Sequence, residues 1–471
     1  MNDIPPPEAF EPQPHVPSGG DRIRRRLQVA LILVLVAALI VLAAVQGSGL
    51  MSVDGDGVEP GPRLAVVDAA GALTWMDGHG GSPVSYTESG LLFQFPAWSP
   101  DGTRIAAVGT NADGGGVYVI DARAPTDTPN EPTRIYQSPD RAPFYLYWTP
   151  DGRQVSFLTT EPDGLALRVA PADGSGSAYI ARSGAPMYWD FIDPDRMLVH
   201  SGSSGPDAFF GEIGLDGSPF DGTDRSAGTF RAPVVSADGR YRAYLSSAND
   251  PIGEIVRESR EDAGTTRIRV FGAGALAFNP SGTELAFVAA DQPTSAALPL
   301  PVGPLRILDA NASEPRTLIE GNVVAFFWSP TGREIAVLQL PSADNPVTEA
   351  GLDRTVVLAR ATVAAPRARA TVTAPRARAI AAGVGLELSV VETEAGTIRA
   401  QRSVQVSDLF VNQVLPFFDQ YALSHRFWSP NGDSLILPIV GDGDLTELHV
   451  IPADGSDSSV VAIAEMGFWS P

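Results

Sequence analysis

Histidine is the side chain most often used for acid–base catalysis and metal binding near neutral pH, and here the histidines lie far apart in the sequence. No two of them form the His-Glu-x-x-His or His-x-His pairs that hold zinc. The five are His15, His79, His200, His425 and His449. The chain also has no cysteine, which excludes thiolate nucleophiles, disulfides and cysteine-based zinc sites. We therefore predict no metal, no cofactor and no catalytic residues, and hence a protein that is not an enzyme.

Short matches to chemical motifs are better explained as turns. Gly432-Asp-Ser-Leu435 spells a block found in a lipase and esterase family, but it directly follows Trp428-Ser-Pro-Asn431. We expect a turn glycine there, leading into a strand. The Asp-Gly-Asp sequences at 54–56 and 442–444 lack the distal glutamate of a calcium loop. The absence of lysine forbids a phosphate-binding Gly-x-x-x-x-Gly-Lys loop.

Aromatic residues, joined in one place by a histidine and an arginine, are the remaining candidates for a functional surface. Aromatic and arginine side chains are favoured at recognition hot spots. The strand alternation should send about half of them into packing instead. The predicted binding residues are Tyr145, Tyr188, Trp189, His425 and Arg426. The partner they predict is a protein, a peptide or a cell-envelope glycan.

These residues precede a turn sequence that recurs along the chain. Successive copies start 41 to 50 residues apart, except for one interval of 100 between Trp328 and Trp428. That period is typical of the four-stranded blades of a β-propeller. The copies are Trp98–Gly102, Trp148–Gly152, Ile192–Asp195, Val235–Gly239, Phe278–Gly282, Trp328–Gly332, Trp428–Gly432 and the truncated Trp469–Pro471.

The turn chemistry explains why these residue types recur. Proline presets φ for the second position of a type I turn, and glycine supplies the positive φ that restarts the chain antiparallel. Short alternating strands follow, such as Ile105–Val108 and Leu285–Val288. Further Asp-Gly turns, as at Ala172–Gly174, give each repeat a second hairpin. The tryptophan before each turn is expected to lie between neighbouring blades.

The two ends of the chain complement each other. The last residues, Gly467–Pro471, form an inner strand and half a turn with no blade after them, whereas the strands from Leu64 to Tyr86 lack an opening Trp-Ser-Pro element. Joining them makes one composite blade and closes the ring without open edges. The predicted fold is therefore all-β, an eight-bladed β-propeller over residues 63–471, with seven or nine blades as alternatives.

The repeats resemble those of the TolB-type periplasmic propeller family, and are also similar to the propeller modules of prolyl-oligopeptidase-like peptidases. The resemblance covers residues 63–471 and rests on the Trp-Ser-Pro-Asp-Gly copies in order. It implies the fold. Neither the α/β domain of TolB nor an α/β-hydrolase domain has a counterpart in the sequence, so the resemblance implies no particular reaction or partner.

The net charge of −22 lies entirely after residue 46, because the first 46 residues hold equal numbers of acidic and basic side chains. An acidic domain repels nucleic acid, whose binding requires neutralisation of phosphates by basic residues. We therefore predict no nucleic-acid partner. The oligomeric state cannot be derived from these features.

An apolar run near the N-terminus predicts a membrane anchor. Leu27–Val45 contains a single polar side chain, Gln28, and as a helix it would span about 28 Å, close to the thickness of a bilayer's hydrocarbon core. The arginines at 22–26 favour a cytoplasmic N-terminus. We expect a disordered cytoplasmic tail at 1–26, a transmembrane helix at 27–46, a flexible tether at 47–62 and an extracytoplasmic propeller in the cell membrane. A cleaved signal peptide is the alternative.

An insertion at about 341–385 accounts for most of the doubled interval. It contains a tandem nonapeptide, Arg360–Ala368 followed by Arg369–Ala377. Such low-complexity sequence predicts a mobile basic loop. The loop either contacts anionic lipid, cell-wall polymer or an acidic partner, or lies loosely on the acidic propeller. Its arginines are Arg354, Arg360, Arg367, Arg369, Arg376 and Arg378.

A second irregular segment, Val406–Ser424, has apolar residues at helical spacing from 409 to 415 and then Pro416. We expect a short helix on the rim or over the channel mouth, stopped by the proline, or else a core element.

Taken together, these features predict a membrane-anchored, extracytoplasmic propeller that serves as a non-catalytic binding module. The first alternative is a propeller enzyme, a glycan hydrolase or lyase, which requires two convergent carboxylates at the channel mouth. The second is an accessory or sensor subunit of an envelope complex.

Overall fold

The computed structural model describes residues 61–471 except 87–89, 124–130, 203–207, 221–231, 250–251, 263, 291–300, 342–383, 442 and 444. The predicted tail, the predicted transmembrane helix, most of the tether and nearly all of the arginine-rich insertion lie outside the described residues. Within the part that is described, no helix is both long and apolar enough to cross a membrane.

The described chain is a series of antiparallel sheets in which sequential strands pair with each other. The first two sheets are β28-β1-β2-β3 and β4-β5-β6-β7. The strands of the first are β1 (Arg63–Val67), β2 (Leu73–Asp77), β3 (Val84–Tyr86) and β28 (Met466–Trp469). Those of the second are β4 (Leu92–Trp98), β5 (Arg104–Asn111), β6 (Gly114–Asp121) and β7 (Thr133–Ser138).

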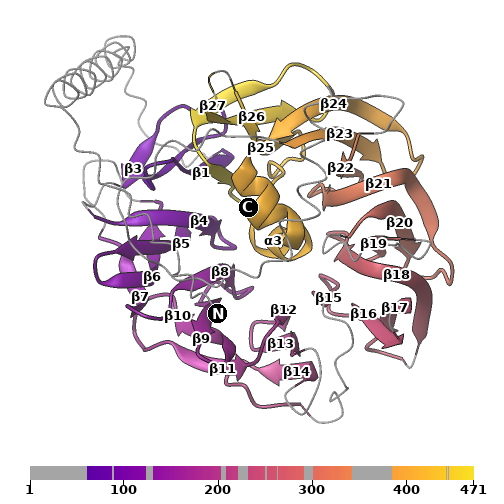
Figure 1. The fold of residues 1–471 in the computed structure, drawn as a ribbon, viewed down its shortest axis with the longest axis horizontal. Coiled ribbons are helices and arrows are strands. Elements are labelled where there is room, and N and C mark those ends of the chain that lie inside the picture. Colours follow the sequence, from indigo (N-terminus) through magenta and orange to yellow (C-terminus); the bar gives the residue numbers. More distant parts are fainter. Residues whose placement is uncertain are drawn as a thin grey trace, which may run out of the picture. The chain divides into compact units, whose positions relative to one another are not determined.

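The third sheet has the order β11-β10-β9-β8 and the fourth the order β12-β13-β14. The strands of the third are β8 (Pro143–Trp148), β9 (Gln154–Glu161), β10 (Gly164–Pro171) and β11 (Tyr179–Ser183). Those of the fourth are β12 (Met187–Asp193), β13 (Arg196–Ser201) and β14 (Phe209–Gly214). Figure 1 shows these sheets arranged around a common centre, with β4, β8 and β12 on the inner side.

The remaining strands, from β15 to β27, are hydrogen-bonded in sequence order as one 13-stranded sheet. Its first seven strands are β15 (Val234–Val235), β16 (Tyr241–Asn249), β17 (Ile252–Ser259), β18 (Thr265–Phe278), β19 (Glu284–Ala290), β20 (Gly303–Asp309) and β21 (Arg316–Trp328). Its last six are β22 (Glu334–Gln339), β23 (Val384–Glu392), β24 (Ile398–Val406), β25 (Ser434–Val440), β26 (Thr446–Pro452) and β27 (Ser459–Ile463).

Two long strands and one short bridge, between Val406 in β24 and Ile439 in β25, make this sheet continuous. The first half of β18 pairs with β17, its second half pairs with β19, and the register shifts between Phe271 and Gly274. Strand β21 pairs in the same way with β20 and then with β22. Each long strand therefore serves as the last strand of one meander and the first strand of the next.

The repeated turns have the predicted chemistry. In the first copy the backbone N–H of Gly102 donates to the carbonyl oxygen of Ser99 (2.8 Å), and Gly102 has a φ of 66°. Asp101 accepts hydrogen bonds from the Ser99 hydroxyl (2.5 Å) and the Thr103 backbone N–H (3.0 Å). Although partial burial opposes ionisation, these hydrogen bonds keep the pKa of Asp101 below its usual value. The glycine is required because its conformation is left-handed.

The tryptophans before the turns bridge neighbouring repeats, as predicted. In four copies the indole N–H donates to the carbonyl oxygen of the residue just before the corresponding turn position in the preceding repeat, whereas the buried indole N–H of Trp469 has no such partner among the described residues. The bonds are Trp98 to Phe468 (3.2 Å), Trp148 to Ala97 (2.9 Å), Trp328 to Ala277 (3.2 Å) and Trp428 to Phe327 (2.9 Å).

The predicted joining of the chain ends is confirmed. Strand β28 pairs antiparallel with β1, with Leu64 opposite Trp469 and Ala65 opposite Phe468. The Ser470 backbone N–H donates to the carbonyl oxygen of Arg63 (2.8 Å). The first sheet is thus built from both ends of the described chain.

Candidate functional site

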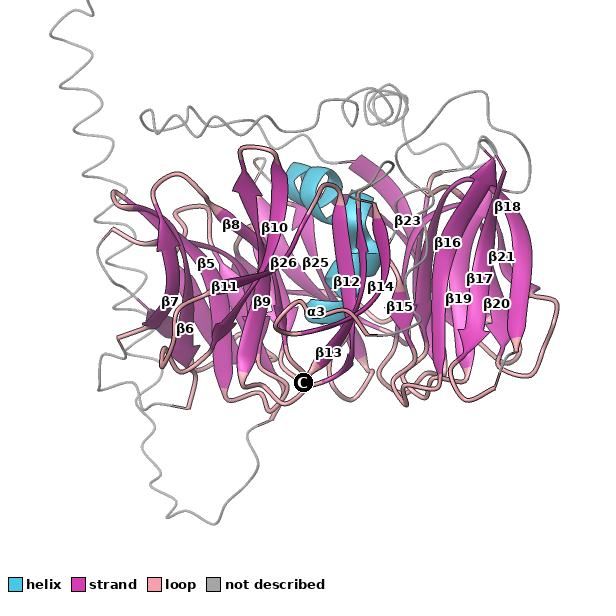
Figure 2. Cartoon of the chain, turned by 90° about the horizontal axis from the view of Figure 1, so that it is seen from below, coloured by secondary structure: helices cyan, strands magenta, loops and turns pink. Residues whose placement is uncertain are grey.

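The centre of the ring is occupied by a helical segment between β24 and β25. It consists of a π-helix, η1 (Phe410–Val414), a 3-10 turn, η2 (Leu415–Phe417), and the helix α3 (Phe418–Ser424). Helix α3 contacts β8, β18 and β21, and it lies at the centre in Figure 1 and between the strands in Figure 2. The helix η1 ends at Val414, before Pro416, as predicted, but the chain continues in helical conformation through η2 and α3. Pro416 is tolerated there because the first N–H groups of a helix have no acceptor within it.

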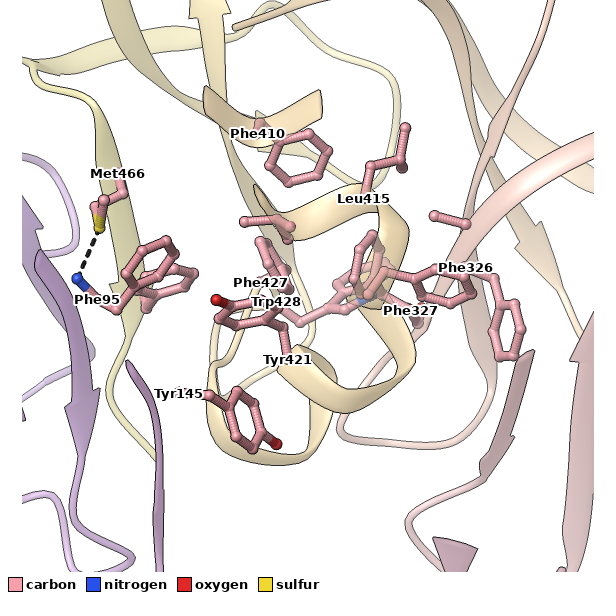
Figure 3. Packing of buried hydrophobic residues seen from close by; sticks show 14 of the residues in the cluster. Phe95, Tyr145, Phe326, Phe327, Phe410, Leu415, Tyr421, Phe427, Trp428 and Met466 are labelled. Carbon is pink, nitrogen blue, oxygen red and sulfur yellow. Dashed lines mark hydrogen bonds between the residues drawn. The ribbon is translucent and has the colours of Figure 1, made fainter. Parts of the chain in front are cut away.

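Burial holds this segment in place. Its buried apolar side chains are Phe410, Val411, Val414, Leu415, Phe418 and Tyr421. Figure 3 shows several of them packed among the inner strands. At roughly 1.5–3 kcal/mol for each fully buried side chain, their burial stabilises the seated segment by on the order of 10 kcal/mol. The segment is therefore part of the hydrophobic core.

Two inner strands bend to meet α3. Phe95 in β4 and Tyr145 in β8 both have a φ of 49°, the left-handed region, and each lies where the strand's register shifts. Both rings contact Tyr421, with centroid distances of 5.3 Å. Left-handed backbone at a non-glycine residue costs about 1–3 kcal/mol. The contacts of both buried rings with Tyr421 offset this cost.

Tyr145 and Trp189, two of the predicted binding residues, lie in this packed centre. The Tyr145 hydroxyl donates to the carbonyl oxygen of Gln420 (2.5 Å), and burial raises the pKa of Tyr145 well above its usual value. The Trp189 indole N–H donates to the Ser156 hydroxyl (3.0 Å). Tyr188 beside it is also buried. None of these three side chains is open to a ligand in this conformation, and their role in binding stays a prediction.

His425, the fourth predicted residue, ends the helical segment and is buried as well. Its Nδ1 lies 2.6 Å from the Ser424 hydroxyl, and its ring contacts Phe468 (4.5 Å) and Tyr421 (5.4 Å). Burial lowers the pKa of His425 to about 3. The imidazole is therefore neutral at physiological pH.

Arg426, the fifth, is exposed. Its backbone carbonyl accepts the N–H of Trp469 (2.9 Å), which fixes its position beside the closing strand. It is the one predicted binding residue that solvent reaches.

The structure adds Asp190, which the sequence analysis missed. Its Oδ1 accepts the Tyr147 hydroxyl (3.0 Å) and the Phe191 N–H (2.8 Å), and its Oδ2 accepts the Val235 N–H (2.7 Å). Burial raises the pKa of Asp190 to about 6. A signal was present in the sequence, since this is the single acid within the apolar run Met187–Ile192.

An open groove lies on the outer rim, away from the centre. It has a volume of about 640 Å³ and runs along β7, the outermost strand of its sheet, beside the loop that joins β10 and β11. Arg134 and Gln137 are linked across its wall by a 2.6 Å hydrogen bond. Its lining residues are Asp113, Arg134, Ile135, Tyr136, Gln137, Pro139, Gly176, Ser177 and Ala178.

Acidic and histidine side chains do not assemble into a metal-binding group among the residues that are described. The predicted absence of a metal or cofactor is not tested by this observation.

Comparison with known proteins bears on the fold. No protein-family model matches the chain, and no curated protein sequence matches it. The dihydro-heme d1 dehydrogenase NirN has a similar structure, with a TM-score of 0.51 and 13% identity over 90% of this chain and 78% of that chain. A prolyl endopeptidase matches with a TM-score of 0.48 and 10% identity over 81% of this chain and 50% of that chain.

TolB from Acinetobacter baumannii matches with a TM-score of 0.34 and 17% identity, over 55% of this chain and 64% of that chain. At these identities the similarities concern the fold alone. The sheets around a common centre and the β28–β1 closure define the class of this protein: it is a β-propeller, all-β apart from its central helical segment.

Proposed function

We propose that this chain is an extracytoplasmic, eight-bladed propeller that is held to the membrane by residues 27–46 and serves as a non-catalytic binding module. The blade count is supported by the four meanders that precede β15 and by four more along β15–β27, with Phe427 and Trp428 as the inner strand of the last. The partner is a protein, a peptide or a cell-envelope glycan.

The observation that carries the proposal is the packed centre. Asp190 and His425, whose chemistry would suit acid–base catalysis, are held in the core by hydrogen bonds and ring contacts. A general acid or base must reach the proton that it transfers. The features that solvent does reach, the rim groove and Arg426, carry the polar and charged side chains of a recognition surface.

Photo-crosslinking in intact cells tests the binding function. A crosslinking amino acid at Gln137 in the groove, or at Asn431 beside the inner strand of the last blade, is expected to capture the same partner reproducibly. Arg267, exposed and paired with Glu254 (3.1 Å), is the matched control position. A capture pattern at 137 and 431 that equals the pattern at 267 would overturn the proposal.

A specific observation favours the enzyme alternative as a second candidate. Asp190 and Asp419 are both buried, and beside the larger effect of burial both carboxylates contribute to the raised pKa of Tyr145, so both lie within electrostatic range of this tyrosine. A glycoside hydrolase uses two carboxyl groups, one of them an acid with a raised pKa, and burial raises the pKa of Asp190. Glycan turnover by full-length wild type that disappears in Asp190→Asn and persists in the control Arg267→Gln would establish this candidate. Absence of turnover by both wild type and Arg267→Gln would remove it.

A further inference from the structure

Strand β27 is the outer edge of the last repeat. It pairs with β26 on one side and ends the 13-stranded sheet, and Figure 1 shows it on the outer side of that repeat. Among the described residues, none of its backbone groups forms a hydrogen bond outside this pairing. An edge strand of this kind presents N–H and C=O groups that can pair with another extended chain.

The edge of β27 lacks the protection that the other outer strands have. Natural proteins protect a sheet edge by keeping it short or by placing charged side chains on it. Strand β3 has three residues, whereas β27 has five, Ser459–Ile463, and none of them is charged. The other strands that end a meander carry charged residues: Arg134 in β7, Arg182 in β11, Glu212 in β14, Arg267 and Arg269 in β18, Arg316 in β21, and Arg399 and Arg402 in β24. Strand β27 is therefore the described edge best suited to accept a further strand.

Two aliphatic side chains of β27 are open to solvent. Val460 is 50% exposed and Ile463 is 62% exposed. The register shifts between them, so that Val460 lies opposite His449 and Ile463 lies opposite Glu447, on one face of the sheet. Ala462 packs instead against the buried cluster between the first sheet and the last repeat. The strand is thus anchored through one face and offers aliphatic side chains on the other.

The hairpin that ends with β27 is acidic. Thr446–Glu465 contains no arginine, and its acids are Glu447, Asp454, Asp457 and Glu465. Two arginines of the adjacent β24 already have partners, because Arg399 pairs with Glu334 and Arg402 donates to the Ser456 carbonyl oxygen (2.6 Å). A second copy of this chain would bring the same acids to the edge and be repelled. Charge complementarity therefore favours a basic occupant.

We propose that β27 accepts an extended, basic peptide segment of a partner protein as an additional strand, an inference that rests on the binding function proposed above. In this mode of recognition, backbone hydrogen bonds to the edge supply affinity and alternate side chains supply specificity. Val460 and Ile463 contact β-branched side chains of the segment. Lysine or arginine residues at the two ends of the segment pair with the acids of the hairpin.

Fluorescence anisotropy with full-length protein in detergent tests this site, with labelled Gly-Lys-Val-Thr-Val-Lys-Gly amide as the probe. Ile463→Lys should bind the probe about tenfold more weakly than wild type, because it loses an apolar contact and adds a like charge. Ile180→Lys is the matched control, since Ile180 is 45% exposed on the outer strand β11, and it should bind like wild type. Equal binding by all three proteins, or no binding by wild type, would overturn the proposal. If Ile463→Lys lowers the unfolding midpoint, Val460→Lys repeats the test on the same face.

Two altered peptides separate strand pairing from charge attraction. Gly-Lys-Val-Pro-Val-Lys-Gly amide should bind about tenfold more weakly than the probe, because proline cannot donate to the ladder. Gly-Glu-Val-Thr-Val-Glu-Gly amide should not bind measurably. If the proline peptide binds as well as the probe, strand pairing is wrong, and if the acidic peptide does, the basic partner is wrong.

The other possible occupants give different results. Probe binding that becomes stronger when residues 342–383 are deleted would replace the external partner with the arginine-rich insertion of this chain. A dimer of wild type that Ile463→Lys abolishes would replace it with a second copy. If crosslinking at 137 or 431 captures a partner and these peptides fail to bind, only the β27 site is lost and the binding function stands.

Discussion

Two buried titratable residues near the centre respond to pH in opposite directions. Burial raises the pKa of Asp190 to about 6, so the folded protein holds a proton there that the unfolded chain loses near pH 4. Burial lowers the pKa of His425 to about 3. Between about pH 3 and pH 6.5 the unfolded chain therefore binds a proton at this histidine, whereas the folded protein does not. The Asp190 contribution to stability falls as pH rises from 4 to 6, whereas the His425 contribution rises over the same interval.

Replacing either residue alone should expose the response of the other. In His425→Gln only Asp190 remains, so the free energy of unfolding should decrease between pH 4 and 6. In Asp190→Asn only His425 remains, so it should increase over the same interval. Each change should be roughly 3 kcal/mol, because a pKa difference of one unit corresponds to about 1.4 kcal/mol. Urea unfolding of the full-length protein at pH 4, 5 and 6 measures both slopes.

The double variant is the control for this pH experiment, because it lacks both groups and should show a profile as flat as that of wild type. Parallel slopes in the two single variants would contradict the opposed pKa shifts.

At the same scale, the sequence predicted residue types better than residue exposure. The sequence predicted Tyr145, Trp189 and His425 as candidates for a binding surface, but sequence alternation does not reveal that these side chains are buried around a helical segment at the centre. Asp190 stands out in the sequence as the single acid of an apolar run, but it was missed because that signal does not show that the side chain is buried and hydrogen-bonded.

At the scale of elements, two arginines each link one repeat to the next. Arg104 in β5 lies over the Trp148 ring, 5.0 Å from its centroid, and donates to the carbonyl oxygen of Gly152 (2.7 Å). Arg63 in β1 lies over the Trp98 ring in the same way, at 4.9 Å. One side chain thus joins the strand of one repeat to both the tryptophan and the turn glycine of the next.

A double-mutant cycle measures the interaction between Arg104 and Trp148. Arg104→Met keeps the apolar stem and removes the charge and the hydrogen bond, and Trp148→Leu removes the ring. The two changes should be coupled by about 0.5–1 kcal/mol in urea unfolding, the usual range for a solvent-accessible cation over an aromatic ring.

Arg123→Met is the matched control, because Arg123 is exposed and the ion pair that it makes among the described residues is with Asp121 in its own repeat (3.1 Å). It should show no coupling to Trp148→Leu. Strict additivity of Arg104→Met and Trp148→Leu would show that the contact contributes nothing to stability.

The turns and their tryptophans could be predicted because each is specified within five consecutive residues. The helical segment could be predicted only in part. Its apolar spacing was visible from 409 to 415, but the sequence does not show that Pro416 starts a new turn, that α3 continues to Ser424, or that β4 and β8 adopt left-handed backbone to meet it. Those features result from contacts between residues hundreds of positions apart.

At the scale of the whole molecule, the ring depends on the closing strand. Phe468 lies opposite Ala65 in the composite sheet, and its ring contacts His425 (4.5 Å) and Phe427 (5.4 Å). It therefore joins the first sheet both to the last repeat and to the end of the central segment. Without β28, the inner edge of β1 would be an unpaired strand that promotes aggregation.

Phe468→Ala should therefore act on the entire domain. Removing a fully buried phenylalanine costs about 3–5 kcal/mol. If ring closure couples the sheets, the variant should unfold in a single transition at a lower temperature or denaturant concentration than wild type. Tryptophan fluorescence and circular dichroism should report the same transition. Phe417→Ala is the control, since that ring is 43% exposed and its loss should move the transition little. Fluorescence and circular dichroism transitions that separate in Phe468→Ala would mean that sheets remote from β28 unfold independently. Closure would then be a local contact rather than the element that makes the ring cooperative.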